Sequence, residues 1–442
     1  MLETMSTIEL ASAPERPTRL QEGRRQPARL PVLFLIADTG GGHRSAARAV
    51  GQALDRLYPG RFGPVLCDPL GGPDSARLLR WVTGLYGPAI RLAPWLWGAA
   101  YRATDSRAAM RVLRRALLRL ADRPALTAAG HHPAAIVSFH PLTGAAAVAA
   151  RDRAAPGSPA VTVVTDLART HAAWRHGGAD LIVVPAAASA GPGTGDTPAW
   201  MAAGPPVTRD FWGGPLRGRD ERSALRRSLG VPEDRFLVLL TGGGEGSGGI
   251  GRRAAAIVRR LPEVDVVAVC GRNRRLRQRL DRLAAGSGGR LTVTGFTRDM
   301  AGWLRCCDLV VTKAGPGTIA EATCCGAPLL LTSHVPGQER GNAEFVTRAG
   351  AGRRARRVSG MLREIEDLRA DGWRLAEMRA ASVRLGRPGA AADIARAIAD
   401  LVGEQAAGAE MAGPVGAGAE AAVELAAVTA VTGAGAGRAG RC

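Results

Sequence analysis

The chain has 442 residues, of which 46% are hydrophobic and 22% are charged. This length predicts two or three domains, and the apolar content excludes both a mini-protein and a globally disordered chain. The formal net charge of +20 comes almost wholly from arginine, because Lys313 is the only lysine. Such an excess attracts anions, whether sugar nucleotides, acidic lipid surfaces or polynucleotides.

Both ends of the chain are poor in large apolar side chains. Residues 1–30 are polar and rich in Pro, Arg and Glu, and residues 403–442 are rich in Ala, Gly and Glu. We expect both segments to be disordered. The sequence contains neither a secretory signal nor a run of about 18 apolar residues. It therefore predicts a protein of the cytoplasm.

The cysteines and most histidines form no metal-ligand pattern. No CxxC pair occurs, and the cysteines that lie in apolar stretches are expected to be reduced, buried thiols. These are Cys270, Cys306, Cys307, Cys324 and Cys325. The histidines away from the first domain's strand ends lack HExxH or ligand-plus-carboxylate spacing, so we predict neither a metal nor a cofactor. These are His131, His132, His171, His176 and His334.

Strand and helix patterns alternate between residues 31 and 205. Short β-branched runs that end in Gly, Asp or His precede helical stretches, which is typical of βα units around a parallel sheet. The expected strands are Val32–Ala37, Ala135–Phe139, Val161–Thr165 and Leu181–Pro185, and the expected helices include His43–Leu57 and Ala145–Arg153. We therefore predict a first Rossmann-like domain over residues 31–205.

A second series of the same kind follows a stretch rich in Gly, Pro and Ala. Its expected strands are Phe236–Leu240, Val264–Cys270, Leu291–Thr294, Asp308–Thr312 and Pro328–Thr332. The series predicts a second Rossmann-like domain over residues 206–402, joined to the first near residues 205–230. The predicted fold class is α/β, with two doubly wound domains that face a cleft, because ligands of such sheets bind outside the carboxyl ends of the strands.

A histidine follows a glycine turn at the end of the first expected strand. Gly40–Gly42 places His43 in the first turn of a helix, where the helix dipole favours the neutral imidazole that a general base requires. The alternative is a histidine that is hydrogen-bonded near the helix cap. Asp38, His140 and Asp166 occupy neighbouring strand ends, and this clustering favours a functional site.

The turn Gly315–Thr318 follows a strand of the second domain and opens a helix. Glycines let a ligand approach the backbone closely, and free N–H groups together with the helix dipole favour a diphosphate. The alternative is a tight turn in which Thr318 and Glu321 form a capping box. A Walker A loop is excluded, because Lys313 precedes the glycines.

A further glycine turn has the spacing G-x-G-x-x-G at Gly244–Gly249. The next strand ends in Gly271 and Arg272 without an acidic residue for a ribose, so the pattern alone is a weak indication of a dinucleotide site. Two alternatives stay open at this point. Arg272 could bind the 2′-phosphate of NADP, or the loop could serve another phosphorylated ligand.

Aromatic residues and arginines are concentrated between Trp81 and Arg123. The first part, Trp81–Tyr101, contains several Trp and Tyr residues beside Arg91, and Arg107–Arg123 is a basic helical pattern. Aromatic rings mixed with arginine are typical of a membrane interface. A helical subdomain packed on the sheet is the alternative.

Five motifs, taken in order, resemble the monogalactosyldiacylglycerol synthases and the related diacylglycerol glucosyltransferases, which are distant relatives of the peptidoglycan N-acetylglucosaminyltransferase. The motifs are Asp38–Arg44, Gly243–Gly246, Cys270–Asn273, Lys313–Ala322 and Pro336–Glu339. The resemblance runs from about Pro31 to about Gly352. It implies a GT-B fold and an inverting, metal-independent hexosyltransferase that uses a UDP-sugar in glycolipid biosynthesis.

The resemblance also implies roles for residues at the strand ends. His43 is the expected base that activates the acceptor, and Glu321 is expected to bind the donor ribose. Asp166, from its place at a strand end, is the second candidate for the base. The other expected donor contacts are Gly243, Gly244, Gly271, Arg272, Asn273, Phe296, Gly315, Pro316, Gly317, Thr318, Gln338 and Glu339. The expected acceptor contacts are Gly41, Gly42, His140 and Pro141.

The expected partners are a UDP-hexose, a lipid acceptor such as diacylglycerol, and the anionic inner face of the cell membrane, where the protein would be peripheral. No specific nucleic acid is expected, because the arginines are dispersed along the chain. A GT-B sugar-nucleotide epimerase, and a transferase for a polyprenyl lipid or hydrophobic metabolite, are the alternatives. Residues 186–203 depart from the family pattern, so the resemblance predicts no hinge geometry there.

Overall fold

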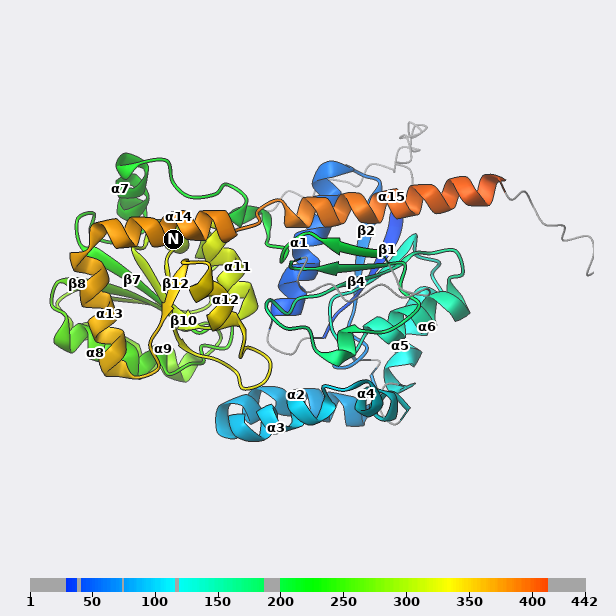
Figure 1. Cartoon of the computed structure of the whole chain (residues 1–442), viewed down its shortest axis with the longest axis horizontal. Helices are drawn as coiled ribbons and strands as arrows, with labels where there is room; N and C mark the ends of the chain where they lie inside the picture. Colours follow the sequence, from blue (N-terminus) through cyan, green and yellow to red (C-terminus); the bar gives the residue numbers. More distant parts are fainter. Residues whose placement is uncertain (1–28, 38–40, 74, 116–118, 187–198, 412–442) are drawn as a thin grey trace, which may run out of the picture.

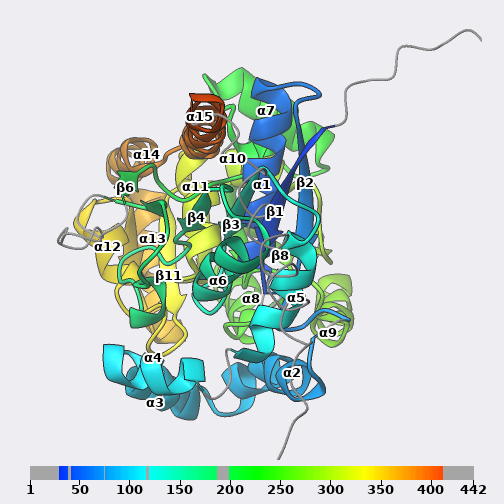
Figure 2. The same cartoon turned by 90° about the vertical axis from the view of Figure 1, so that its right-hand side faces the viewer.

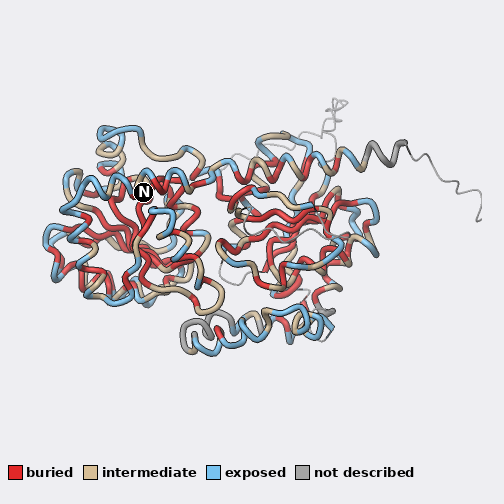
Figure 3. Tube along the Cα trace, viewed as in Figure 1, coloured by how far each residue is buried: buried red, intermediate tan, exposed pale blue. Residues whose placement is uncertain are grey.

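The computed structural model contains two parallel α/β sheets, one in each half of the chain (Figure 1). It describes residues 29–37, 41–73, 75–115, 119–186 and 199–411. Each sheet has six strands, and neighbouring strands run parallel in both. Buried residues follow the two sheets and the helices that cover them (Figure 3). The predicted fold class is confirmed.

The first sheet has the strand order β2-β1-β3-β4-β5-β6. Its strands are β1 (Leu30–Leu35), β2 (Phe62–Cys67), β3 (Ala135–Ser138), β4 (Ala160–Val163), β5 (Leu181–Val184) and β6 (Ala199–Ala202). Strands β3, β4 and β5 are buried along their whole length, as expected for parallel strands covered on both faces. The edge strands β2 and β6 lie outside the sequence-based expectation, because Gly63 and Pro64 interrupt the first and the second is partly exposed.

Helices α1 (Gly42–Leu57) and α6 (Gly144–Ala154) cover the first sheet. Four more helices separate β2 from β3, namely α2 (Arg77–Leu92), α3 (Pro94–Thr104), α4 (Arg107–Leu113) and α5 (Arg119–Ala129). Helix α5 enters the core beside the sheet through Ala125 and Ala129, and Leu79 of α2 packs in a smaller buried cluster with Ala37. Figures 1 and 2 show α2, α3 and α4 at one end of the first unit, away from the strands.

The second sheet has the strand order β12-β11-β10-β7-β8-β9. Its strands are β7 (Phe236–Thr241), β8 (Val264–Val269), β9 (Leu291–Thr294), β10 (Leu309–Lys313), β11 (Leu329–Ser333) and β12 (Gly352–Arg354). The helices between them are α8 (Ile250–Arg260), α9 (Arg274–Ala285), α10 (Met300–Cys306), α11 (Pro316–Cys324) and α12 (Asn342–Arg348), and α7 (Arg219–Ser228) precedes β7.

The five cysteines expected to be buried are buried and form no disulfide. Two of them, Cys324 and Cys325, lie in the core that α10 and α11 share with the second sheet. Burial raises the pKa of the Cys324 thiol to about 11 and that of the Cys325 thiol to about 12. These thiols therefore behave as small apolar groups at neutral pH.

The last three helices are α13 (Val358–Ala370), α14 (Gly372–Leu385) and α15 (Ala390–Met411). Helix α15 packs against α1, and its Ile394, Ile398 and Val402 belong to the core of the first unit. Two expectations are corrected. Residues 390–402 pack with the first domain and not with the second, and residues 403–411 continue the helix instead of starting a disordered tail. Residues 1–28 and 412–442 lie outside the described residues.

Candidate active site

Loops at the carboxyl ends of the two sheets touch each other. A Cβ placed on Gly41 of the first unit would lie 3.8 Å from Arg272 Nη1 of the second. A Cβ placed on Gly341 would lie 3.1 Å from Ala168 Cβ. The predicted site residues of both units therefore come from one border, where a ligand held by one unit is within reach of the other.

His43 occupies the first turn of α1, and its imidazole is held by the strands and not by its own helix. The N-cap is Gly41, which has a left-handed φ of 84° and makes no side-chain cap bond. His43 Nδ1 lies 2.8 Å from the carbonyl oxygen of Phe139 and 3.0 Å from Thr165 Oγ1. A carbonyl only accepts, so Nδ1 carries the hydrogen of the neutral ring and Nε2 carries the lone pair. This tautomer suits a general base that acts through Nε2.

His140 follows β3 and packs edge-on against His43, with ring centroids 4.5 Å apart. Its Nδ1 accepts a hydrogen bond from the backbone N–H of Leu142 at 3.2 Å. Burial, and to a smaller degree the neighbouring His43, hold the pKa of His140 well below its ordinary value. A neutral His140 therefore adds no positive charge beside His43, so it does not oppose uptake of a proton there.

Asp166 follows Thr165 in the loop after β4 and is buried. Its Oδ2 accepts a hydrogen bond from Trp174 Nε1 at 2.7 Å. Burial raises the pKa of Asp166 to about 6, although the Trp174 hydrogen bond opposes the rise; Glu339 of the second unit adds a small increase. A carboxyl group with this pKa exchanges protons near neutral pH. Asp38, which the strand-end pattern also singled out, lies outside the described residues.

Three predicted acceptor residues lie around these side chains. Among the described residues, a Cβ on Gly42 would meet no atom within 4 Å. Gly41 combines its positive φ with the approach to Arg272. Pro141 directly follows His140 and begins the turn that leads into α6.

The glycine turn after β7 packs against the turn after β8. Gly271 has a φ of +58°, and a Cβ on it would lie 2.3 Å from the carbonyl oxygen of Gly244 and 2.8 Å from that of Gly243. The N–H of Arg272 donates to the oxygen of Gly244 at 2.8 Å. The G-x-G-x-x-G spacing therefore serves loop packing, with α8 starting after its last glycine, Gly249.

Arg272 and Phe296 form an exposed flat surface beside these turns. The guanidinium of Arg272 lies 5.3 Å from the centre of the Phe296 ring, and Phe296 is 61% exposed. Arg272 Nη1 also pairs with Glu245 at 3.1 Å. Asn273 caps α9 by accepting from the N–H of Leu276 at 2.9 Å, so its side-chain oxygen has a structural role.

Helix α11 begins at Pro316, with Gly315 as an N-cap that makes no side-chain cap bond. Thr318 is therefore inside the first turn, and the alternative Thr318–Glu321 capping box is not formed. A Cβ on Gly317 would meet no atom within 4 Å. The first-turn N–H groups of Gly317 and Thr318 are left for a ligand by the geometry of an α-helix.

Glu321 lies one turn further along α11 and is partly exposed. Burial raises the pKa of its carboxyl group to about 7. Within the described residues, its side chain has neither a hydrogen bond nor an ion pair. A carboxylate placed beside a helix N-terminus and left without a protein donor is suited to accept hydrogen bonds from a ligand's hydroxyl groups.

Lys313, the last residue of β10, lies against the turn of α11. Its Nζ forms an ion pair with Glu339 Oε1, and a Cβ on Gly315 would lie 2.9 Å from the same Nζ. Glu339 is buried, and its Oε2 accepts from the N–H of Val335 at 2.7 Å. Both oxygens of Glu339 are therefore engaged within the protein, and the ammonium group of Lys313 lies beside Gly315, the N-cap of α11.

The loop between β11 and α12 carries Gln338 and Glu339 and contacts the first unit. A Cβ on Gly337 would lie 2.8 Å from the ring of Tyr101, and one on Gly98 would lie 2.6 Å from Pro336 Cβ. Helix α3 of the first unit therefore packs on the loop that holds two predicted donor contacts.

Asn342 joins the two units and was missed by sequence reasoning. Its Oδ1 accepts from the N–H of Ala168 at 3.2 Å, and its Nδ2 donates to the oxygen of Ala314 at 2.9 Å. The side chain is 2% exposed. An asparagine at the start of a short helix usually indicates a cap, so only its long-range partners reveal this function.

No group of three or more His, Cys, Asp or Glu side chains in the described residues could hold a metal ion. The chemistry available at the border therefore consists of one imidazole lone pair, two carboxyl groups with raised pKa values, a helix N-terminus and a lysine. A candidate base on one side and a helix N-terminus that can seat a diphosphate on the other are suited to a group-transfer enzyme.

Two facing Rossmann-like units with such a seat define the GT-B class of glycosyltransferase. The crystal structure of MurG from Acinetobacter baumannii has this fold, with a TM-score of 0.52 and 18% identity over 84% of this chain and 99% of that one. The structure of HepE from Anabaena, solved in complex with UDP-glucose, has a TM-score of 0.52 and is 15% identical, over 85% of this chain and 100% of that one. The structure of a UDP-GlcNAc 2-epimerase from Neisseria meningitidis has a TM-score of 0.53 and is 12% identical, over 84% of this chain and 100% of that one. At these identities the likeness shows the fold alone.

Residues 237–394 match the glycosyltransferase family 28 C-terminal domain. The chain is 34% identical over 343 residues to a probable monogalactosyldiacylglycerol synthase 2 of Oryza sativa subsp. indica, across 75% of this chain and 71% of the relative. It is 30% identical over 397 residues to monogalactosyldiacylglycerol synthase 3 of Arabidopsis thaliana, across 85% of this chain and 82% of the relative. Both relatives are named as chloroplastic. The chain belongs to the monogalactosyldiacylglycerol synthase family of GT-B glycosyltransferases, and the predicted family and enzyme class are confirmed.

Proposed function

We propose that the enzyme transfers a hexose from a UDP-sugar to the hydroxyl group of diacylglycerol, with inversion at the anomeric carbon and without a metal. The observation that carries the proposal is the pairing of His43, whose lone pair is on Nε2, with the N-terminus of α11 across the border between the units. The names of the plant relatives support a galactolipid product. The UDP-glucose in the HepE structure supports a UDP-sugar donor only as far as a shared fold can.

In this proposal the second unit binds the donor. The uracil ring packs beside Phe296 and Arg272, and the ribose hydroxyls donate to the Glu321 carboxylate. The diphosphate lies at the first turn of α11, where the helix N-H groups and the Lys313 charge attract it. Gln338 contacts the sugar hydroxyls from the loop before α12, and Glu339 keeps that loop and Lys313 in place.

His43 starts the transfer from the first unit. Its Nε2 takes the proton of the acceptor hydroxyl, while that oxygen attacks the anomeric carbon and forms the new glycosidic bond. The bond from the anomeric carbon to the β-phosphate oxygen breaks, and UDP leaves with the bonding electrons. Charge that develops on the diphosphate is stabilised by the N-terminus of α11 and by Lys313. Asp166, with a pKa near 6, is the second candidate for the proton acceptor.

The acceptor is proposed to reach the site from a membrane. Helices α2, α3 and α4 expose large apolar side chains, as expected for a protein that rests on a lipid surface. These are Leu78, Trp81, Leu85, Trp95, Leu96 and Val112. No helix in the described residues is long and apolar enough to cross a bilayer. We place the enzyme on the inner face of the cell membrane, bound peripherally through this surface.

The test is a transfer assay with radiolabelled UDP-galactose, UDP-glucose and UDP-N-acetylglucosamine, each supplied with diacylglycerol or with a total lipid extract. We expect a labelled lipid that appears only with an acceptor and persists in EDTA. A product that forms from the UDP-sugar alone would identify an epimerase instead. Label that enters a polyprenyl lipid but not diacylglycerol would keep the transfer chemistry and replace the acceptor.

A further inference from the structure

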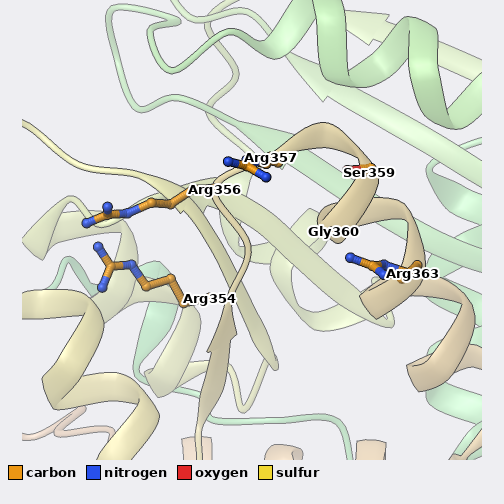
Figure 4. Close-up of a pocket in the computed structure, with 6 residues that line it drawn as sticks. All are labelled: Arg354, Arg356, Arg357, Ser359, Gly360 and Arg363. Atoms are coloured by element: carbon orange, nitrogen blue, oxygen red, sulfur yellow. The ribbon is translucent and has the colours of Figure 1, made fainter.

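Four arginines gather at the edge of the second sheet, away from the residues assigned to the donor. Together with Ser359 and Gly360 they line a cavity of about 520 Å³ (Figure 4). They are Arg354 at the end of β12, Arg356 and Arg357 in the connection that follows, and Arg363 in α13. All four side chains are exposed, and the residues that line the cavity include no acid.

The charges of this arginine cluster are not compensated by the chain. In the described part of the structure, no acidic side chain forms an ion pair with any of the four. The adjacent Arg353, by contrast, pairs with Glu364 at 3.0 Å. Like charges this close repel one another, and the repulsion falls when an anion lies between them. The cluster therefore has the electrostatics of a site for an anion.

Backbone geometry adds hydrogen-bond donors to the same cavity. Helix α13 has 13 residues and starts at Val358, with Arg357 as an N-cap that makes no side-chain cap bond. Ser359 and Gly360 belong to its first turn, whose N–H groups are left without a partner in the helix. Arginine forks beside free N–H groups match the oxygens of a phosphate group.

The arginine cluster adjoins the surface that carries the exposed tryptophans. Arg354 pairs with Leu331 of β11, and the N–H of Ala355 donates to the oxygen of Leu331 at 3.0 Å, so the cluster begins beside the strand that leads into the loop after β11 at His334. Two residues later in that loop, Pro336 packs against Gly98 of α3. Trp95, one helical turn before Gly98, is 71% exposed. Basic and aromatic groups thus follow one another across the border between the two units.

We propose that the arginine cluster binds the phosphate of an acidic lipid headgroup and forms a second membrane contact, on the unit that binds the donor. A lipid is favoured over free phosphate because the four side chains are exposed and the loop after the neighbouring strand β11 packs on α3, which carries part of the exposed apolar surface. Both units would then rest on the same membrane. The inference goes beyond the transfer reaction, and binding is measured without substrate, so its failure would leave the proposed function untouched.

The test compares two variants with the same loss of charge. One carries Arg354→Gln and Arg356→Gln, and the control carries Arg217→Gln and Arg219→Gln beside α7, which lies at the opposite end of the second unit from α3 in Figure 1. Flotation is measured with phosphatidylcholine vesicles that contain or lack phosphatidylglycerol. Because each basic residue at an anionic surface contributes about 1 kcal/mol, we expect the first variant to bind the anionic vesicles roughly 10- to 30-fold more weakly and the control to bind like wild type.

Three results would overturn the proposal. The first is anionic-vesicle binding that is equal in the two variants, since a general loss of charge would then explain it. The second is saturable binding of inorganic phosphate in calorimetry, lost in the first variant while vesicle binding is unchanged, which would indicate a soluble anion. The third is loss of oligonucleotide binding without loss of vesicle binding. An Arg363→Gln variant with an unchanged melting temperature repeats the test from α13 if the double variant does not fold.

Discussion

The two sides of the candidate active site differ in whether side chains or backbone groups form them. On the first unit, His43, His140 and Asp166 are buried side chains held by hydrogen bonds or packing between different elements. On the second unit the proposed donor site is mainly backbone, formed by glycine turns and by the N-terminus of α11. In the proposed mechanism the first side transfers the proton, and the second side binds the negatively charged diphosphate of the donor.

This contrast predicts how each side fails. Deleting one side chain should abolish the chemistry of the first unit and leave donor binding intact. Changes in the second unit should weaken donor binding and leave the proton chemistry intact, whether they remove a side chain that binds the ligand or add a Cβ where a ligand approaches the backbone.

His43→Ala should lower kcat/KM for transfer by about 10²- to 10⁴-fold, because a general base typically contributes that much. UDP affinity, measured by calorimetry, should be unchanged. The matched control is His131→Ala, which removes an exposed histidine away from the site. A residual rate within tenfold of wild type would assign the base elsewhere, and a parallel loss of UDP affinity would show that His43 is structural.

Glu321→Gln should weaken binding of the UDP-sugar by at least about 1.5 kcal/mol, the scale of a hydrogen bond to a charged group. The ribose hydroxyls donate hydrogen bonds to the ionised carboxylate and so bind it better than the protonated acid. Donor binding therefore lowers the pKa of Glu321 from about 7 and releases a proton. Affinity in wild type should therefore rise as the pH increases through about 7.

Calorimetry between pH 6 and pH 8 measures this dependence, in buffers with different ionisation enthalpies. A UDP-hexose is the ligand of choice, because its diphosphate does not titrate near neutral pH. The Gln variant should show no proton release. Equal pH dependence in both proteins would remove Glu321 from the ribose site.

Gly317→Ala should leave the fold unchanged, because the new Cβ meets no protein atom within 4 Å. A diphosphate at the first turn of α11 would meet it, and we expect UDP to bind roughly fivefold more weakly, about 1 kcal/mol for an overpacked contact. Gly372→Ala, at the first residue of α14 and equally free of neighbours, is the control. Equal UDP affinity in both variants would move the diphosphate away from Gly317.

Trp174→Phe should have the smallest effect. Without the indole hydrogen bond, the Asp166 carboxylate is less stable and its pKa rises above the present value of about 6. If ionised Asp166 assists transfer, the acidic limb of the kcat/KM profile moves to higher pH, with less than about a tenfold loss at pH 7. Trp200→Phe is the control, because the Trp200 indole has no hydrogen-bond partner in the described residues. If the acidic limb of the kcat/KM profile of Trp174→Phe does not move, Asp166 has no part in the reaction.

The sequence by itself determined the features that depend on local pattern. Alternating β-branched runs and helical stretches predicted both parallel sheets, because covered strands must be apolar along their length. Glycine turns after strands placed His43 and Gly315 at helix N-termini, since turn chemistry is read from neighbouring residues. The edge strands β2, β6 and β12 escaped this reasoning, because an exposed edge does not require a continuous apolar run.

Only the tertiary structure decided the features that depend on contacts between distant segments. The tautomer of His43 follows from Phe139 and Thr165, which are 96 and 122 residues away in the chain. The Lys313–Glu339 ion pair, the bridge made by Asn342 and the return of α15 to the first unit are likewise non-local. Local propensity and periodicity hold no information about which distant groups meet, because that is set by the packing of whole elements.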